Sequence, residues 1–307
     1  SGMADIAALG GDPEYIQAIN RIWEDVVFRK LYITGGIGAR AGGEAFGEDY
    51  ELPNASAYNE TCAAIANAMW NHRLFLLHGD AKYIDVLERI LYNGFLSGVS
   101  LTGDTFFYPN PLESEGKDRS PWFDCSCCPT NVVRFLPSIP GFVYAHRGND
   151  LYVNLYIGGS GIVKTNGNSV TLAQKTDYPW NGRISLTLDP EVEAEFTVHL
   201  RIPGWAQGKP VPSDLYRYLN PDCEEIVLAV NGYRWPIELD KGFACIRRVW
   251  NKGDRITLEL PLPIRRVLCR ETVEDNRGKV AVERGPVLYC AEWVDNGGTV
   301  FDLTLPD

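Results

Sequence analysis

The sequence predicts a multidomain α + β protein, with a helical part at residues 1–147 followed by an antiparallel β-sandwich at residues 148–307. Three observations support this prediction. Apolar residues recur with a helical period up to about residue 146, and they alternate with polar residues from about residue 150 onward. The chain of 307 residues, 45% of them hydrophobic, is also long enough to bury a large core.

Four helices are expected in the first part. The first opens at Asp12, a capping residue, with Pro13 at the first helical position. The second, which begins near Cys62, is apolar and alanine-rich around most of its circumference, so we expect it to be buried. The third follows Asp80, another capping residue. The fourth is expected to start at Pro129, and two later prolines should distort or end it.

The second part consists of short segments in which apolar and polar residues alternate, separated by Gly, Pro, Asn and Asp. Many short strands without intervening helices indicate a β-sandwich. The segments are LYVNLYIGG, SVTLAQK, ISLTLD, AEFTVHLRIPGW, EIVLAVNG, FACIRRVW, RITLELPLPIRRV and KVAVERGPVLYCAE.

Charge and composition exclude several classes of partner. The net charge is -11 and no basic cluster or stripe is present, which argues against binding to nucleic acid or to anionic membranes. No apolar run is long enough to span a bilayer, and the first residues lack the pattern of a signal peptide. A chain of this size does not need disulfides, so we expect the eight cysteines to be mostly reduced and the protein to be cytoplasmic.

Two groups of acidic and thiol side chains stand at predicted helix starts. One is Glu60 and Cys62, which can share a ligand only if Glu60 lies before the helix, because residues two apart point to opposite sides of a helix. The other is Cys127 and Cys128, with Cys125 nearby. Helix N-termini stabilise thiolates and carboxylates. Three thiolates and one carboxylate form a set that tetrahedral zinc accepts, with Cys125 as the spare or as a replacement.

Other roles for these cysteines stay open from the residues alone. Cys127 and Cys128 could form a strained vicinal disulfide, Cys125 and Cys128 could be a redox pair, and a zinc ion could be purely structural. Nearby loops are rich in aromatic and polar groups, namely Glu44 between glycines and the FFYPNPLE segment with Tyr108 and Asn110. Such loops suit sugar binding and acid catalysis, which favours a zinc ion with a chemical role.

Several motifs give the chain a family resemblance. The segments GGEAFGEDYELPN, ETCAAIA, CSCCPTN, LRIPGWA and VERGPVLYCAE, in this order and spacing, resemble glycoside hydrolase family 127, the β-L-arabinofuranosidases, and the related family 146. The resemblance implies an (α/α)6 barrel followed by β-sandwich domains, and a small L-arabinofuranoside as substrate. It also implies that Glu60, Cys62, Cys127 and Cys128 bind zinc, that Cys127 is the nucleophile and that Glu44 is the general acid/base.

The helix count departs from the family pattern. A complete barrel has about twelve helices and only four are predicted here, so the chain resembles the C-terminal part of such an enzyme. We expect a homo-oligomer or a missing barrel half supplied by another chain. The resemblance thus predicts a retaining β-L-arabinofuranosidase, and it leaves open whether this chain alone is fully active. The alternatives are a non-catalytic, zinc-stabilised fragment that binds carbohydrate or a partner, and a thiol redox protein.

Overall fold

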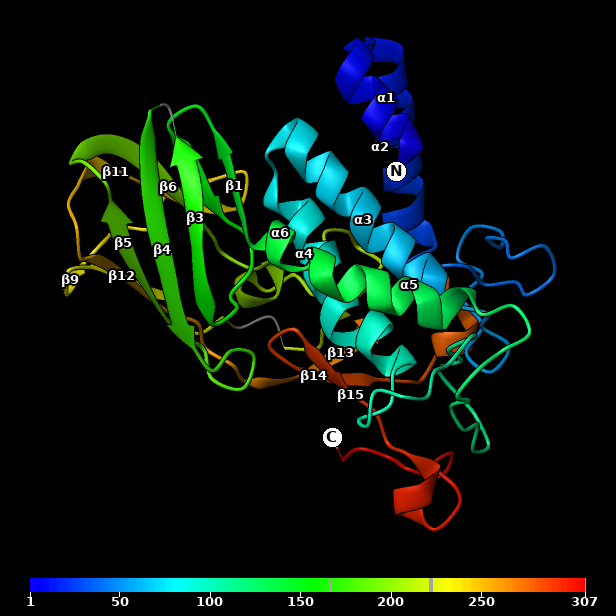
Figure 1. Cartoon of the computed structure of the whole chain (residues 1–307). Helices are drawn as coiled ribbons and strands as arrows, with labels where there is room; N and C mark the ends of the chain where they lie inside the picture. Colours follow the sequence, from blue (N-terminus) through cyan, green and yellow to red (C-terminus); the bar gives the residue numbers. More distant parts are fainter. Residues whose placement is uncertain (166, 221–222, 307) are drawn as a thin grey trace.

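A computed structural model describes residues 1–165, 167–220 and 223–306. The chain has a helical part near its N-terminus and three β-sheets after it; Figure 1 shows the helices beside the two larger sheets, with strands β13 to β15 below the helices. The helices are α1 (Gly2–Gly10), α2 (Pro13–Arg29), α3 (Thr61–His78), α4 (Ala81–Arg89), α5 (Cys127–Phe135) and α6 (Pro140–Val143).

The predicted helices form for the expected local reasons. The Asp12 side chain accepts a hydrogen bond of 2.9 Å from the Glu14 N–H, and Pro13 occupies the first turn of α2. Helix α3 buries residues on about half of its circumference, less than predicted, and ends at Gly79, which has a φ of 63°. Asp80 caps α4 through the Lys82 N–H at 3.0 Å. Three of the predicted helices are therefore confirmed, and α1 was not predicted.

The fourth predicted helix begins earlier than expected. Helix α5 starts at Cys127, two residues before Pro129, because the N–H groups of the first helical turn have no partner within the helix and a proline there costs no hydrogen bond. The prolines that follow do end it, since α5 stops at Phe135 and is followed by a 3₁₀ turn (Leu136–Ser138) and the short α6. Helix α4 continues as a π-helical turn (Ile90–Phe95) and a 3₁₀ turn (Leu96–Gly98).

In the part of the chain that the structure describes, the strands form three sheets, in which every pair is antiparallel except β2 with β6. The five-stranded sheet has the order β1 (Tyr144–Arg147), β2 (Asp150–Val153), β6 (Ala194–Arg201), β11 (Phe243–Trp250), β10 (Leu239–Asp240). The six-stranded sheet has the order β3 (Gly159–Thr165), β4 (Asn168–Thr176), β5 (Arg183–Pro190), β12 (Asp254–Glu259), β8 (Val227–Val230), β9 (Tyr233–Arg234). The four-stranded sheet has the order β15 (Val287–Tyr289), β14 (Ala281–Arg284), β13 (Ile264–Cys269), β7 (Tyr216–Tyr218).

The predicted order, in which helices are followed by antiparallel strands, is confirmed. Alternate residues of the central strands are buried, as the period of two predicts; Val198 and Leu200 on β6 and Ile256 and Leu258 on β12 are examples. The four-stranded sheet is an additional unit that was not predicted. The change from helix to strand falls at Tyr144. The domain boundary at 147/148 and the partial (α/α)6 barrel stay predictions. No helix among the described residues has the length and apolar character needed to cross a bilayer.

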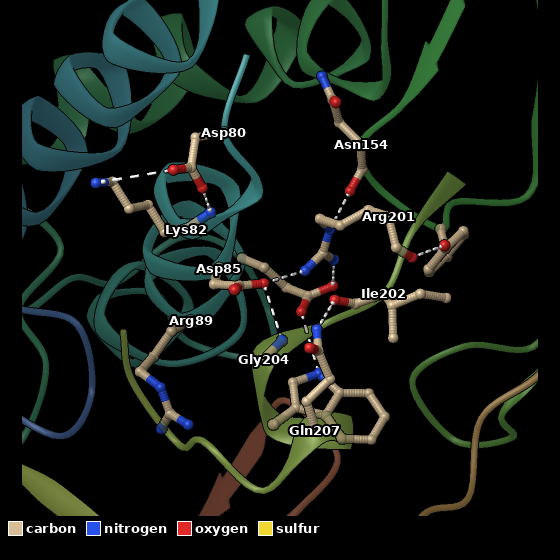
Figure 2. A network of polar contacts seen from close by, with 12 residues as sticks. Asp80, Lys82, Asp85, Arg89, Asn154, Arg201, Ile202, Gly204 and Gln207 are labelled. Carbon is tan, nitrogen blue, oxygen red and sulfur yellow. Dashed lines mark hydrogen bonds and ion pairs between the residues drawn. The ribbon is translucent and has the colours of Figure 1, made fainter. Parts of the chain in front are cut away.

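Buried charges join the helices to two of the sheets. Arg201 on β6 is fully buried and lies 2.7 Å from Asp85 on α4, and it also pairs with Glu88 (Figure 2). The next residue of α4, Arg89, pairs with Glu283 on β14 at 2.9 Å. Two consecutive helix residues are thus bound to two different sheets. Helix α4, which packs against α3, is thereby fixed against the β part of the molecule.

Candidate metal centre and active site

The N-termini of α3 and α5 bring the predicted ligands together. Glu60 is the residue before α3 and has an extended backbone, with φ -63° and ψ 140°, while Cys62 lies in the first helical turn. Because Glu60 lies before the helix, its side chain can converge with that of Cys62, as the sequence analysis requires. Cys127 and Cys128 are the first two residues of α5. They are helical, although a residue before a proline is usually extended.

The four ligand atoms form a compact cluster. The Cys62 and Cys128 sulfur atoms are 3.5 Å apart, and those of Cys127 and Cys128 are 3.8 Å apart. Oε1 of Glu60 lies 3.4 Å from the Cys127 sulfur and 3.6 Å from that of Cys128. All four atoms lie within 4.8 Å of one another. The cluster could therefore hold a metal ion.

The spacing and chemistry of the cluster fit zinc. With Zn–S bonds of about 2.3 Å and a Zn–O bond of about 2.0 Å, a tetrahedral site has S–S edges of about 3.8 Å and S–O edges of about 3.5 Å. Four of the six distances between these atoms match those edges to within a few tenths of an ångström. Sulfur ligands favour zinc over magnesium or calcium, which prefer oxygen. The residues present thus suit a structural or catalytic metal ion bound mainly by thiolates.

Electrostatics at the cluster also favour a cation. The contact with Cys128 lowers the pKa of Cys62 to about 7. Burial raises the pKa of the Cys127 thiol to about 11, and the contact with Cys62, together with burial, raises that of Cys128 far above its usual range. Several thiolates cannot coexist in so small a volume unless a positive charge lies among them. A metal ion at this position would ionise all three.

A second segment supports the cluster from one side. The Thr61 N–H donates to the Tyr108 carbonyl at 3.1 Å, and the Asn110 N–H donates to the Tyr58 carbonyl at 3.1 Å. The Tyr108 hydroxyl lies 3.1 Å from the Cys127 sulfur. Tyr108, proposed from the sequence as a sugar-binding residue, therefore contacts the predicted nucleophile. The hydrogen bond with Cys127 raises the pKa of Tyr108 well above its usual range, so the phenol stays protonated.

Asn110, the second proposed sugar-binding residue, is 8% exposed. Its side-chain amide donates to the Asn59 carbonyl and to the Thr61 hydroxyl, both at 3.0 Å. In return, the Asn59 amide donates to the Asn110 carbonyl at 3.1 Å. This pair of asparagines holds the backbone on which Glu60 is placed. A role of Asn110 in sugar binding stays a prediction.

Glu44 lies in an exposed loop. Its backbone φ is 49°, a value that residues other than glycine seldom adopt. Its Oε1 accepts a hydrogen bond of 2.8 Å from the Tyr58 hydroxyl. The Tyr58 ring is 6.1 Å from the Tyr108 ring, measured between centroids. Tyr58 was missed from the sequence, although it stands two residues before Glu60. It connects the candidate acid/base to the metal cluster.

Exposure describes the surroundings of Glu44 and Cys125. Phe46, two residues after Glu44, is 41% exposed and Glu44 is exposed too, so Phe46 does not enclose Glu44 in an apolar pocket. Cys125 is exposed and stands outside the cluster of four. Cys125, Cys127 and Cys128, the residues of the redox alternative, are free thiols in the described structure.

Three family models match the chain in succession, and together they define its class as glycoside hydrolase. They are described as the β-L-arabinofuranosidase GH127 catalytic domain, at residues 1–141, the GH127 middle domain, at residues 150–262, and the glycoside hydrolase family 127 C-terminal domain, at residues 264–307. Together they cover nearly the whole chain. The chain belongs to glycoside hydrolase family 127.

Individual relatives agree with this. A non-reducing end β-L-arabinofuranosidase of Bifidobacterium longum subsp. longum is 34% identical over 326 residues, covering 100% of this chain and 46% of the relative. A solved structure described as a GH127 β-arabinofuranosidase has 54% identity and a TM-score of 0.93, covering 96% of this chain and 46% of the other. A GH127 β-L-arabinofuranosidase from Geobacillus stearothermophilus T6 has 43% identity and a TM-score of 0.88, with the same coverage. The chain spans about half the length of these relatives.

Proposed function

We propose that this chain carries the metal site and the reacting groups of a zinc-dependent, retaining β-L-arabinofuranosidase. The observation that carries the proposal is the cluster of three sulfur atoms and one carboxylate oxygen at the meeting of two helix N-termini, in a chain of family 127. Relatives described as β-L-arabinofuranosidases support the choice of sugar.

Zinc would be held by Glu60, Cys62, Cys127 and Cys128. When bound, it would supply the positive charge that keeps the Cys127 sulfur ionised at neutral pH. The helix N-terminus adds to this effect, because Cys127 is the first residue of α5. Burial alone has the opposite effect on this thiol, so nucleophilic chemistry at Cys127 depends on the cluster as a whole.

In the first step the Cys127 sulfur attacks the anomeric carbon of the sugar while Glu44 donates a proton to the departing glycosidic oxygen. The carbon–sulfur bond forms as the carbon–oxygen bond breaks, and the aglycone leaves as an alcohol. The sugar is then covalently attached to Cys127. The Tyr108 hydroxyl, 3.1 Å from this sulfur, is placed to orient it and to contact the sugar.

In the second step Glu44, now a carboxylate, removes a proton from a water molecule that attacks the same carbon. The carbon–sulfur bond breaks and Cys127 is regenerated. Two inversions at one carbon give net retention of configuration. Tyr58 donates a hydrogen bond to Glu44 and so holds the carboxylate that must act in both steps.

Hydrolysis of an aryl β-L-arabinofuranoside by the zinc-loaded chain tests the proposal, with the anomeric configuration of the released sugar read by NMR. Cys127→Ser and Glu44→Gln should each remove turnover while the fold is retained. Substantial activity in Cys127→Ser would overturn the nucleophile assignment. Release of the opposite anomer would overturn the retaining mechanism.

A second candidate function is favoured by the open surroundings of Glu44. It is a non-catalytic, zinc-stabilised protein that binds carbohydrate or a partner chain. Bound zinc without hydrolysis would support it. Exposed apolar side chains on α1 and α2, such as Ile6, Leu9 and Ile22, suit a second copy or a further barrel half as the partner. The free cysteines suit a reducing compartment such as the cytoplasm.

A further inference from the structure

Three reactive side chains lie in line on one face of the five-stranded sheet, away from the metal cluster. Cys245 on β11 is paired in register with His199 on β6, and Asp150 lies on β2, the other neighbour of β6. The Cys245 sulfur is 3.4 Å from Nδ1 of His199. Nε2 of the same ring is 3.4 Å from Oδ1 of Asp150. A thiol, an imidazole and a carboxylate therefore stand in the order in which a nucleophile, its base and the group that orients the base are arranged.

The imidazole is held in place by its neighbours. Tyr152 stacks on the His199 ring, with centroids 4.3 Å apart and an angle of 11° between the planes. His199 is 9% exposed, and its Nε2 has no hydrogen-bond partner with good geometry among the described residues. When Nδ1 accepts a hydrogen bond from the thiol, the neutral ring carries its hydrogen on Nε2, facing the Asp150 carboxylate. Asp150 thus favours the tautomer in which Nδ1 is free to act as a base.

The arrangement does not suit a metal ion. His199 contacts Cys245 and Asp150 through its two opposite nitrogens, so the sulfur and the carboxylate oxygen lie on different sides of the ring and cannot bind one ion together with it. Burial raises the pKa of the Cys245 thiol, so this side chain rests in the protonated form. Its reactivity then depends on transfer of the proton to the neighbouring imidazole. The Phe243 carbonyl, 3.7 Å from the sulfur, is the competing acceptor.

We propose that Cys245, with His199 as base and Asp150 as the positioning residue, is a site of thiol–disulfide exchange with small disulfides. The thiol proton moves to Nδ1 of His199, and the Cys245 sulfur attacks one sulfur of the disulfide. The old S–S bond breaks, a mixed disulfide forms on Cys245, and the leaving thiolate takes up the proton from His199. One thiol and one disulfide are consumed and one of each is produced, so no further oxidant is needed.

The charges around Cys245 define which disulfides it should accept. Asp150, Asp240 and Glu238 all place negative charge near its sulfur. Arg147 and Lys241 direct their cationic groups at the end of α3, where Arg147 donates to the Leu76 carbonyl at 3.1 Å and Lys241 to the His78 carbonyl at 2.9 Å. A negative field stabilises the imidazolium formed during transfer and attracts a positively charged reagent. The site is therefore suited to cationic disulfides.

Cys269 provides a matched control within the same chain. It also lies on a strand, is partly buried, and has a thiol pKa that burial raises. No imidazole contacts it among the described residues. It lines a pocket of about 510 Å³ whose charged groups are mostly basic, namely Arg217, Arg270, Arg277 and Lys279 with Asp214 and Glu271. Its surroundings thus have the opposite charge and lack a base.

The experiment measures the rate of modification at each cysteine by peptide mass mapping, with cystamine as the cationic disulfide and dithiodipropionate as the anionic one. Cys245 should react with cystamine at least about tenfold faster than Cys269, and the ratio of the cystamine rate to the dithiodipropionate rate should be higher at Cys245. Equal rates at the two cysteines, or a preference of Cys245 for the anionic reagent, would overturn the proposal.

Variants separate base catalysis from simple exposure. His199→Gln should slow Cys245 by about tenfold, make its rate rise steadily with pH as the thiol ionises, and leave Cys269 unchanged. Asp150→Asn, at a half-exposed side chain, should slow Cys245 by about threefold and serves as the test if His199→Gln does not fold. Unchanged rates in a folded variant would show that Cys245 is an inert buried thiol. The readout does not depend on glycosidase activity.

Discussion

The Tyr58 hydroxyl donates a hydrogen bond of 2.8 Å to Oε1 of Glu44. Burial and this hydrogen bond raise the pKa of Tyr58 above its usual range, so it remains a donor across the neutral range. Its backbone is fixed by hydrogen bonds to Ala39 and Asn110, whereas Glu44 lies in an exposed loop. Tyr58 therefore orients the exposed Glu44 side chain, and through the Tyr108 ring it connects Glu44 with Cys127.

Tyr58→Phe should impair the proposed acid/base step without affecting the metal site. Loss of a hydrogen bond to a charged group costs about 1.5 to 3 kcal/mol, which corresponds to a loss of tenfold or more. We expect kcat/KM to fall by about tenfold for an alkyl arabinofuranoside, whose leaving group needs the proton, and by less for a nitrophenyl one. Tyr233→Phe, at an exposed position on β9, is the control. Equal losses for both substrates would argue against a role through Glu44.

Removal of the metal should destabilise the folded chain. An ion that binds only the folded state at a concentration a hundredfold above its Kd adds about 2.7 kcal/mol. We expect Cys62→Ala to lower the bound zinc, measured by atomic emission, and to lower Tm by about 5 °C. Chelation of the wild-type chain should have the same effect. Cys125→Ala, outside the cluster, should change neither quantity, and a loss of zinc in that variant would show that the ligand set is wrong.

Arg201→Met should be strongly destabilising, because it leaves Glu88 buried without its charged partner. Breaking a buried ion pair in this way costs about 3 to 5 kcal/mol. Arg247→Met, which removes an exposed pair with Glu195, should cost less than about 1 kcal/mol. Urea denaturation compares the two. If the double variant Arg201→Met/Glu88→Leu is no more stable than Arg201→Met, the unpaired carboxylate is not the cause.

His72 should make stability depend on pH in the acid range. Burial, with a smaller effect of Arg73, lowers the pKa of His72 from 6.5 to about 4 in the folded chain. The unfolded chain therefore takes up this proton at higher pH. The contribution to stability is complete above about pH 6.5 and is lost as the pH falls to 4, with a full value of about 3 kcal/mol.

His72→Gln should flatten that part of the pH dependence of the free energy of unfolding. His146→Gln, at an exposed residue of β1, is the matched control and should leave the curve unchanged. A curve for His72→Gln that runs parallel to wild type between pH 4 and 6.5 would contradict the assignment.

Much of the site could be predicted because its signals are local. Capping residues and periodicity located α2, α3 and α4, and the position of Glu60 before a helix followed from the geometry of two residues in sequence. The contacts of Tyr58 with Glu44 could not be found in this way, since they depend on the path of a loop 14 residues away. Strand pairing is less local still.

The third sheet illustrates that limit. It pairs β7 with β13, whose segments are separated by more than 40 residues, and the alternation of apolar residues does not specify which strands are neighbours. The same holds for Cys245, His199 and Asp150, which meet only because β11, β6 and β2 lie side by side. Each of these residues by itself carries no sequence signal of function.

The consecutive residues Glu88 and Arg89 limit how the gene can be divided. Cutting the chain where helix gives way to strand would remove Arg201 and Glu283, the charged partners of Glu88 and Arg89, while the contact of Arg89 with the Ile33 carbonyl would remain. In the helical segment expressed alone, α4 would expose both side chains together with the apolar residues that pack on the sheets, and α4 leads directly into the turns that contact Thr61 beside the cluster. Transfer of this helical segment onto foreign β-domains would therefore require recipients that supply both complementary charges.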